Sequence, residues 1–338
     1  MSITIGRIRL RNRVLLAPMS GVSDAPFREL AHACAAGLVV SEMVASRELV
    51  EQRRDMVRRS VGRGRISPFA IQLAGREARW MAEGARLAQD LGADIIDINM
   101  GCPARQVTGG LSGSALMRDL DHAQRLIEAT VAASHVPVTL KMRLGWDAES
   151  INAPELAQRA EAVGVQMVAV HGRTRSQFYG ERADWRAIRL VKDRIGIPVI
   201  ANGDCVDIES ASRMFAASGA DGIMIGRGSY GRPWWPGAIA ETLAPGSGRR
   251  EPDLAEQSTL VLDHHQSILA LYGHELGNKV ARKHLSWLVE RKREEGWIDP
   301  GETASWRARL VSETDNRRIA LLIQRLFFEL QDIRAKAA

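Results

Sequence analysis

Residues 97–117 read DINMGCPARQVTGGLSGSALM, an apolar run that ends in Asn, Gly and Cys and leads into a loop rich in Gly and Ser. Small residues let the backbone approach a ligand closely. Cys102 stands between a glycine and a proline, where there is little helix or strand to pack against. Free cysteines are usually small buried hydrophobic residues, and we interpret Cys34 and Cys205 in that way. Cys102 is the thiol that we expect to take part in chemistry.

Other apolar runs of the chain also end in polar residues or glycine. These ends hold Pro18, Met19, Ser20, Gln72, Asn99, Lys141, Arg143, His171, Asn202, Gly203, Asp204, Gly226 and Arg227. Single members have ordinary structural explanations, because Gln72 could be a satisfied core amide and Asn99 a turn residue. Lys141 is harder to explain, because burying an unpaired charge at the end of an apolar strand is costly. An anionic cofactor would supply a partner.

The last two runs end in NGD at 202–204 and GRG at 226–228. Glycine-rich ends after the last two strands form the usual phosphate site of barrels built from alternating strands and helices. Arg227 would add a charge-assisted hydrogen bond, although two tight turns with a surface arginine are the alternative. The sequence has no Walker A motif, and no GxGxxG follows its first apolar run. These features favour a phosphate-bearing cofactor such as flavin mononucleotide (FMN).

Eight short apolar runs must position these ends. They span residues 13–19, 38–43, 68–75, 95–101, 137–143, 167–173, 198–204 and 222–228. Nearly continuous apolar runs are typical of parallel strands covered on both faces, and helical patterns separate them here. The order predicts an α/β fold, a (β/α)8 TIM barrel. An open doubly wound sheet is the alternative, but no GxGxxG follows the first strand.

The rhythm of the chain changes at 244–253, which is rich in Pro, Gly and Ser and is interpreted as a linker. Beyond it, apolar residues recur only at helical spacing, which predicts about four short helices in a small bundle. We therefore expect a catalytic barrel over 1–243 and a helical domain over 254–338.

Composition narrows the class of protein. The chain has 338 residues, 45% of them hydrophobic, which is enough for a large core. No apolar run approaches the roughly 20 residues that cross a bilayer, and the N-terminal residues do not read as a signal peptide. Three cysteines without CxxC or Cys/His spacing predict neither zinc nor a disulfide framework, and they suit a reducing cytoplasm.

The net charge of +6 is unevenly distributed. Residues 1–65 hold 12 Arg and six acidic residues, whereas residues 250–338 hold 14 basic and 14 acidic residues. A basic face in the N-terminal third would suit a phosphate-rich partner. A solvated surface that is merely rich in arginine is the alternative.

Several motifs together resemble those of the tRNA-dihydrouridine synthases, most closely the bacterial B type. The motifs are APMSGVSDAPFR, SEM, IQLAG, DINMGCPARQVTGGLSGSALM, LKMRLGW, VHGRTRSQFYG, VIANGD and IGRGSYGRPW. The segment RKHLSW at 282–287 extends the resemblance into the helical region. The stretch VTGGLSG at 107–113 is more glycine-rich than the corresponding loop of some relatives.

The resemblance implies FMN as cofactor, NADPH as electron donor, and reduction of a D-loop uridine in tRNA to 5,6-dihydrouridine. It implies that the flavin is contacted by Pro18, Met19, Ser20, Gln72 and Lys141. It implies that the ribityl chain and phosphate are held by His171, Asn202, Gly203, Asp204, Gly226 and Arg227. It implies that the uracil or its phosphate is addressed by Asn99 and Arg143.

The same resemblance implies that the flavin gives a hydride from N5 to uracil C6 and that Cys102 gives a proton to C5. A thiol suits this task because its ordinary pKa of about 8.5 keeps it protonated at neutral pH, where carboxylates are ionised. In the helical domain, Lys279, Arg282 and Lys283 fall at helical spacing on one side and would contact tRNA. A solvated helix with ion pairs is the alternative for these three.

We expect a cytoplasmic monomer without a metal or a membrane contact. Two other functions stay open at this point. One is an FMN barrel oxidoreductase that acts on a small molecule, and the other is a non-catalytic RNA-binding module on a barrel scaffold. Ribosomal RNA is a third possible substrate that the sequence leaves open.

Overall fold

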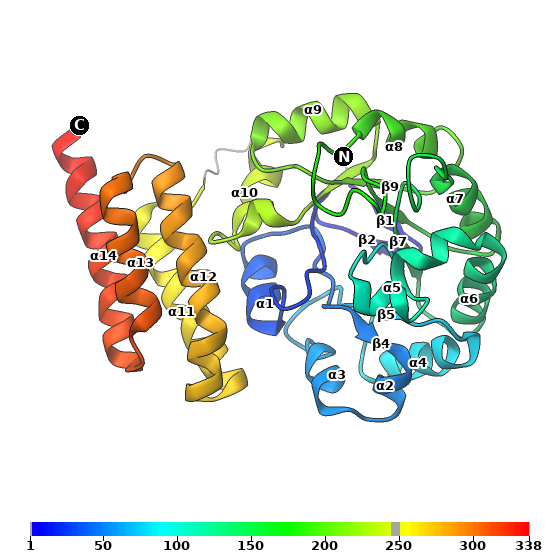
Figure 1. Ribbon diagram of the computed structural model, residues 1–338, viewed down its shortest axis with the longest axis horizontal. Helices are drawn as coiled ribbons and strands as arrows, with labels where there is room; N and C mark the ends of the chain where they lie inside the picture. Colours follow the sequence, from blue (N-terminus) through cyan, green and yellow to red (C-terminus); the bar gives the residue numbers. More distant parts are fainter. Residues whose placement is uncertain (1, 245–250, 338) are drawn as a thin grey trace.

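The computed structural model describes residues 2–244 and 251–337. Eight parallel strands form one curled sheet, in which consecutive strands from β4 to β10 pair with one another and β3 pairs with β10 (Figure 1). The strands are β3 (Val14–Leu16), β4 (Val44–Ala45), β5 (Ala70–Ala74), β6 (Ile95–Met100), β7 (Val138–Arg143), β8 (Val168–His171), β9 (Val199–Asn202) and β10 (Gly222–Ile225). Isolated parallel bridges from Leu16 to Val39 and from Val40 to Ala70 connect the two ends of the sheet. The predicted TIM barrel is confirmed.

Helices surround the sheet, and short ones follow several strands (Figure 1). They are α1 (Ala25–Ala33), α2 (Ser46–Val50), α3 (Arg54–Arg59), α4 (Ala78–Asp90), α5 (Arg105–Gly109), α6 (Leu120–Ala132), α7 (Ala153–Ala162), α8 (Trp185–Lys192), α9 (Ile208–Ser218) and α10 (Trp235–Thr242), with 3-10 turns η1 (Gly113–Arg118) and η2 (Arg227–Ser229). α9 illustrates how the sequence sets these bounds. The side chain of Asp207 caps its first turn, and Gly219 ends it at a φ of 61°.

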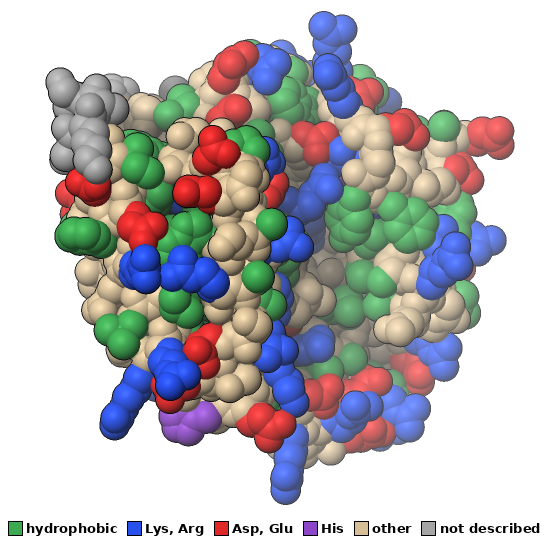
Figure 2. Space-filling model, turned by 60° about the vertical axis from the view of Figure 1, so that its left-hand side comes forward, with side chains coloured by type: hydrophobic (Ala, Val, Ile, Leu, Met, Phe, Trp, Pro, Cys, Tyr) green, Lys and Arg blue, Asp and Glu red, His purple; other side chains and the backbone are tan. Residues whose placement is uncertain are grey.

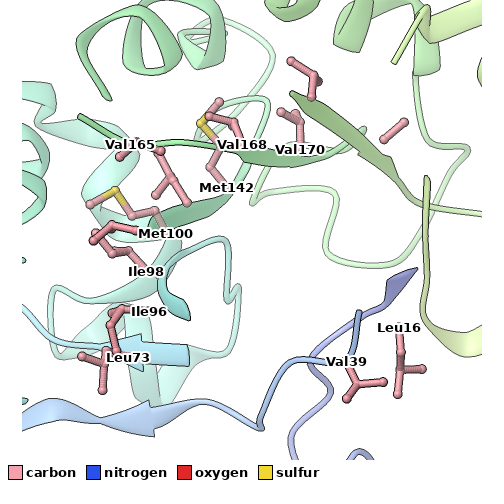
Figure 3. Packing of buried hydrophobic residues seen from close by; sticks show 14 of the residues in the cluster. Leu16, Val39, Leu73, Ile96, Ile98, Met100, Met142, Val165, Val168 and Val170 are labelled. Atoms are coloured by element: carbon pink, nitrogen blue, oxygen red, sulfur yellow. The ribbon is translucent and has the colours of Figure 1, made fainter. Parts of the chain in front are cut away.

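Strand side chains alternate between two apolar layers. In β6, Ile96, Ile98 and Met100 point outward and belong to the cluster that includes residues of the surrounding helices (Figure 3). Ile95 of the same strand points inward and packs in a second cluster with Ala70 and other interior residues. This two-residue period follows from the pleat of a strand, and it decides which residues reach the barrel interior.

The amino-terminal end of the barrel is closed by a hairpin that the sequence analysis did not predict. β1 (Thr4–Ile5) and β2 (Ile8–Arg9) pair in antiparallel fashion. Ile3 and Ile5 are buried in the interior cluster. The Ile/Leu and Arg alternation of this segment is therefore a strand pattern with one face against the barrel.

The second predicted strand, 38–43, is shorter than expected. Only Val39 and Val40 form bridges, and regular pairing resumes in β4. Between them, the hydroxyl of Ser41 accepts a hydrogen bond of 2.9 Å from the backbone N–H of Gln72. A side chain has taken a place in the ladder that a backbone carbonyl would normally hold, and this interrupts the strand.

The C-terminal residues form four helices, α11 (Leu254–Tyr272), α12 (His274–Glu294), α13 (Pro300–Ser312) and α14 (Asn316–Ala337). The predicted helical region is confirmed, although three of its helices have 19 to 22 residues and are longer than expected. None of the described helices combines the length and the apolar character that crossing a bilayer requires. Residues 245–250 of the predicted linker lie outside the described residues, and the domain limits stay a prediction.

The helices pack against one side of the barrel, where α1 contacts α11 (Figure 1). Near this contact, the ring of Tyr230 stacks on that of Trp287 with centroids 4.0 Å apart and planes 14° apart. A hollow separates the helices nearest the viewer from the barrel behind them, and Lys and Arg side chains gather along it (Figure 2). The two parts of the chain therefore form the walls of a basic cleft.

Gly231 allows the close approach of the barrel to α12. Its φ is +72°, and a Cβ atom would lie 2.5 Å from the carbonyl oxygen of Trp287, which is backbone and cannot turn aside. We expect Gly231→Ala to lower the free energy of unfolding by about 3 kcal/mol or more. Gly64→Ala is the matched control, because Gly64 has a φ of +77° and open space around it. The control should lose only about 1 kcal/mol. Equal losses in urea unfolding would show that the contact with α12 contributes nothing.

Candidate active site

Polar side chains replace apolar ones inside the barrel towards the carboxyl ends of its strands. The strand register sets them in rows, and the paired residues are Gln72 with Asp97, Asp97 with Thr139, Asn99 with Lys141, Arg143 with His171, and His171 with Asn202. All are buried except His171, which is partly exposed. Six sequence-predicted residues are therefore brought to one end of the barrel, with Cys102, the seventh, on the loop directly after β6.

A chain of hydrogen bonds runs beneath Cys102. Oδ1 of Asn99 accepts from the backbone N–H groups of Gly101 and Cys102, at 3.2 and 3.0 Å. Nδ2 of Asn99 donates to Oε1 of Gln72 at 2.8 Å, and Nε2 of Gln72 donates to Asp97 at 2.6 Å. The Cys102 loop is thus tied to the interior of β5 and β6 by side-chain amides.

The loop is held from its other side by Ser114 of η1. Both the backbone N–H and the hydroxyl of Ser114 donate to the carbonyl oxygen of Cys102, at 3.0 and 2.8 Å. Gly113, before it, has a φ of +62°, and a Cβ atom there would lie 2.8 Å from the same carbonyl oxygen. The glycine-rich stretch after Cys102 therefore folds back onto the cysteine and fixes its position.

Lys141 lies inside the barrel with 9% of its side chain exposed. Its Nζ donates to Oδ1 of Asn202 at 3.1 Å, and Nδ2 of Asn202 donates to the carbonyl of Met224. Burial lowers the pKa of Lys141 to about 8, the charge of Arg143 acts in the same direction, and Asp97 opposes it. Because Asn202 is neutral, the amine keeps the capacity to pair with an anion.

Arg143 is buried and donates to three backbone carbonyls. Nε contacts Gly101 at 2.8 Å, and Nη1 contacts Thr174 and Phe178 at 2.7 and 2.8 Å. Burial lowers its pKa to about 10, so that the guanidinium is charged at neutral pH. Its guanidinium carbon also lies 5.5 Å from the ring centroid of Tyr179. Arg143 therefore links the Cys102 loop to the loop after β8.

Asp204 pairs with two arginines and does not face an anion alone. Nη2 of Arg173 donates to both of its carboxylate oxygens, at 2.8 and 2.7 Å, and Arg227 approaches at 3.4 Å. Asp204 has a φ of 58°, a conformation that glycine favours. A carboxylate repels a phosphate, so its contribution to a phosphate site would be to hold these two cations in place.

His171 is neutral at pH 7. Burial lowers its pKa well below 6.5, and the charges of Lys141, Arg143, Arg173 and Arg227 act in the same direction. Nη1 of Arg173 lies 3.2 Å from its Nε2. Because an arginine only donates, Nε2 is the acceptor and the proton of the neutral ring resides on Nδ1. His171 can therefore donate from Nδ1 to a ligand.

The loop after β3 lies beside Gly226. Pro18 and Met19 are partly exposed and Ser20 is exposed. A Cβ atom on Gly226 would lie 3.6 Å from the sulfur of Met19 and 3.7 Å from the Cβ of Ala17, which is ordinary van der Waals contact with the loop after β3. Gly203, in contrast, has a φ of +116° and a crowded position against Ala183. Its carbonyl accepts from Nε1 of Trp185 at 2.8 Å.

The three predicted cations of the helical domain lie apart from the barrel interior, on α12. Lys279 is exposed and forms an ion pair with Glu275 at 2.8 Å on its own helix. Lys283 is partly buried, which lowers its pKa, while the charges of Asp24 and Glu42 raise it. Arg282 and Lys283 line a groove of about 700 Å³ between α12 and α13. Arg293 and Arg307 complete its basic lining.

Sequence reasoning missed three residues of the site. Asp97 is a carboxylate inside an apolar strand, which is as costly to bury as Lys141, and this was its signal. Arg173 follows His171 within the same motif, and the need of a buried arginine for a carboxylate points to Asp204. Tyr179 is 53% exposed beside Arg143 and Arg227, at 5.5 and 5.3 Å. Its aromatic ring is a candidate for stacking against a flat ligand.

Comparison with known proteins identifies relatives of the whole chain. The dihydrouridine synthase (Dus) family model matches residues 15–317. A probable tRNA-dihydrouridine synthase of Rhizobium leguminosarum bv. phaseoli is 54% identical over 311 residues, which is 92% of this chain and 94% of that protein. The tRNA-dihydrouridine synthase B of Xanthomonas campestris pv. campestris is 41% identical over 325 residues, 96% of this chain and 95% of that protein.

Solved structures share the fold at low sequence identity. Histamine dehydrogenase from Rhizobium sp. 4-9 superposes with a TM-score of 0.54 and 14% identity over 78% of this chain, which spans half of that protein. Morphinone reductase in complex with tetrahydroNAD gives a TM-score of 0.50 and 15% identity, over 76% of this chain and 93% of that protein. Within the described residues, no group of three or more His, Cys, Asp or Glu side chains could hold a metal ion.

The lowered pKa of Lys141 makes stability depend on pH. Between pH 8 and 10.5, the unfolded chain holds this proton and the folded chain has released it. The free energy of unfolding therefore rises with pH across this window, and the contribution is lost as pH falls through 8. Relative to Lys141→Met, the parental chain should gain about 2 kcal/mol between about pH 7.5 and 9.5 in urea unfolding. Parallel curves for the two proteins would contradict the shift.

Proposed function

The chain belongs to the dihydrouridine synthase family of flavin oxidoreductases, and we propose on this premise that it reduces a D-loop uridine of tRNA to 5,6-dihydrouridine. FMN would be its cofactor and NADPH its electron donor. The observation that carries the proposal is the position of Cys102 at the carboxyl end of the barrel, within the electrostatic range of Lys141 and Arg143. The cytoplasm would be its compartment, because three free cysteines suit a reducing environment.

The residues at the barrel mouth fit FMN. Lys141, Arg143, Arg173 and Arg227 supply four cations near one opening. Asp204 is paired with Arg173, and Asp97 is hydrogen-bonded to Gln72 and Thr139. This surplus of positive charge suits a phosphate and the electron-rich edge of a flavin ring. Gly226 has no side chain, so a ligand could approach the backbone after β10 closely.

When bound, reduced FMN supplies a hydride from N5 to C6 of the uracil. Cys102 would give the proton that C5 needs, which leaves a thiolate on the enzyme. Lys141 and Arg143 are the cations within electrostatic range of that sulfur. Asn99 and Ser114 keep the loop of Cys102 in place during the transfer, so that the thiol does not have to be repositioned.

A uridine in folded RNA must turn outward to reach the interior of a barrel. Extrusion costs a few kcal/mol and is least costly for a base that is already unstacked. The basic cleft between the barrel and the helices would hold the RNA backbone (Figure 2). Arg282 and Arg307 of the α12–α13 groove would add phosphate contacts. The exposed ring of Tyr179 would stack on the everted base or its neighbour.

Cys102→Ala tests the proton donor. The variant should keep its flavin absorbance and its tRNA affinity but lose nearly all dihydrouridine formation, because no thiol remains to protonate C5. Cys34→Ala is the control, since Cys34 lies at the end of α1. Dihydrouridine formation is measured with tRNA and with free uridine as substrates under the same conditions. Parental turnover in Cys102→Ala would mean that another group is the acid. Reduction of free uridine as fast as of tRNA would favour an enzyme that acts on a small molecule. A colourless parental protein would favour an RNA-binding module.

Neutralising the α12–α13 groove tests the RNA contact. Arg282→Gln with Arg307→Gln should weaken tRNA binding and reduce the slope of log K against log salt by about one to two, since each phosphate contact contributes about −0.7 to −0.9. Flavin content should not change. Arg325→Gln on the outer face of α14, where the residue pairs with Glu329, is the control and should bind as the parent does. Equal salt slopes in all three proteins would remove this groove from the tRNA interface.

A further inference from the structure

We propose that Asp97 is a positioning residue that fixes which way the amides of Gln72 and Asn99 face, and that it thereby holds the loop of Cys102. Only the effect of Asp97 on catalysis rests on the proposed function. The structural content of the inference depends on hydrogen bonds that already exist within the chain. It adds to the site a residue that lies beneath the ligand-facing side chains.

The carboxylate sets one end of the chain of hydrogen bonds. Oδ2 of Asp97 accepts from Nε2 of Gln72 at 2.6 Å, and Oδ1 accepts from the hydroxyl of Thr139 at 2.6 Å. Asp97 is 3% exposed, so water does not replace these partners. Because Oδ2 is an acceptor, Gln72 must turn its nitrogen towards it and its oxygen away. A proton on Oδ1, towards Thr139, would leave this orientation unchanged.

The backbone sets the other end. The N–H groups of Gly101 and Cys102 are donors in every protonation state, and both point to Asn99. Asn99 must therefore present Oδ1 to the loop and Nδ2 to Gln72, whose oxygen accepts at 2.8 Å. The orientation required by the backbone agrees with the one required by the carboxylate. Turning either amide would bring two donors or two acceptors together at a buried contact.

The fixed orientation decides what the site offers to a ligand. Each amide nitrogen has two hydrogens, and one of them is used within the chain. The second hydrogen is the group that Gln72 or Asn99 can present to a ligand at the barrel mouth. With Asp97 in place, each amide therefore has an N–H donor left to offer, and the oxygen of Asn99 is already occupied by two backbone donors. Donors complement the carbonyl oxygens and ring nitrogens of a flavin or a uracil.

Four variants separate this role from a general effect on folding. Asp97→Asn can keep Oδ1 towards Gln72 while its amide nitrogen donates to Thr139, whose hydroxyl can also accept. Thr139→Val leaves the carboxylate of Asp97 in place for Gln72. In the double variant Asp97→Asn with Thr139→Val, the new amide nitrogen at position 97 has no acceptor at position 139. It finds one only by turning towards Gln72, and this reverses the direction of the hydrogen bonds through Gln72 and Asn99. Asp97→Leu removes both acceptors.

The readout is the alkylation rate of Cys102 by iodoacetamide in the full-length purified protein, resolved from Cys34 by peptide mass spectrometry. Both single variants, Asp97→Asn and Thr139→Val, should label Cys102 within about two-fold of the parental rate. The double variant and Asp97→Leu should label it about ten-fold faster and bind FMN about ten-fold more weakly, the effect of losing one buried hydrogen bond. Labelling of Cys34 should be equal in all of them.

Three results would overturn the proposal. They are parental labelling in the double variant, equal losses in Asp97→Asn and Asp97→Leu, and purely additive effects of the two single substitutions. If Asp97→Leu does not fold, the nearly isosteric double variant decides the question, with thermal unfolding as the check on its stability. Alkylation of Cys102 requires no tRNA and no turnover. A protein that makes no dihydrouridine but shows this labelling pattern would refute the proposed function and leave the role of Asp97 intact.

Discussion

A strand of a barrel places every second side chain inside, and the positions of the site residues that lie on strands follow from that constraint. In β6, Ile95, Asp97 and Asn99 share the inward face, while Ile96 and Ile98 pack outward against the helices. The interior is apolar at the amino-terminal end, where the β1–β2 hairpin closes it, and polar at the other end. A shift of one residue in the register of β6 would put the amide and the carboxylate among the helices and three apolar side chains in the site.

The polar end of the interior is stable because its charges are paired or hydrogen-bonded. Arg143 satisfies three backbone carbonyls of two loops, and Arg173 satisfies the carboxylate of Asp204. These contacts make the cations structural as well as electrostatic, since removing one would leave several acceptors unsatisfied. The field that they create is therefore present before any ligand arrives. Donors and charges that need no rearrangement are the arrangement that stabilises a developing charge most effectively.

The sequence was sufficient to predict the barrel, because each strand is a nearly continuous apolar run with a distinct polar end. It was also sufficient for the location of Cys102, since a cysteine between Gly101 and Pro103 has no regular element to pack in. It failed at the second strand, where the hydroxyl of Ser41 replaces a backbone acceptor. Propensity does not describe such a substitution, because the partner, Gln72, lies 31 residues further along the chain.

The connections within the site were also beyond sequence reasoning. Gln72 and Asn99 were recognised one at a time, but their bond to each other and to Asp97 depends on the register of β5 and β6. Arg173 and Asp204 were separated by the whole of α8, so that their pairing required the barrel to bring β8 beside β9. The residues predicted to face a ligand could be recognised in the sequence by their types, whereas Asp97 and Arg173, which hold them, could be recognised only from contacts in the structure.

The seam where Gly231 meets α12 has a consequence for how a nucleic acid is handled. The backbone of the barrel at Gly231 contacts the backbone of α12 at Trp287, and the Tyr230–Trp287 ring stack lies beside this contact. These contacts set the distance between the two walls of the cleft. When the walls of a cleft are held at one spacing, the RNA has to change its own shape to fit. Under the proposed function, the choice among RNAs would then depend on how easily each RNA deforms. A rigid hairpin with the target sequence would be a poorer substrate than a deformable tRNA elbow with another sequence.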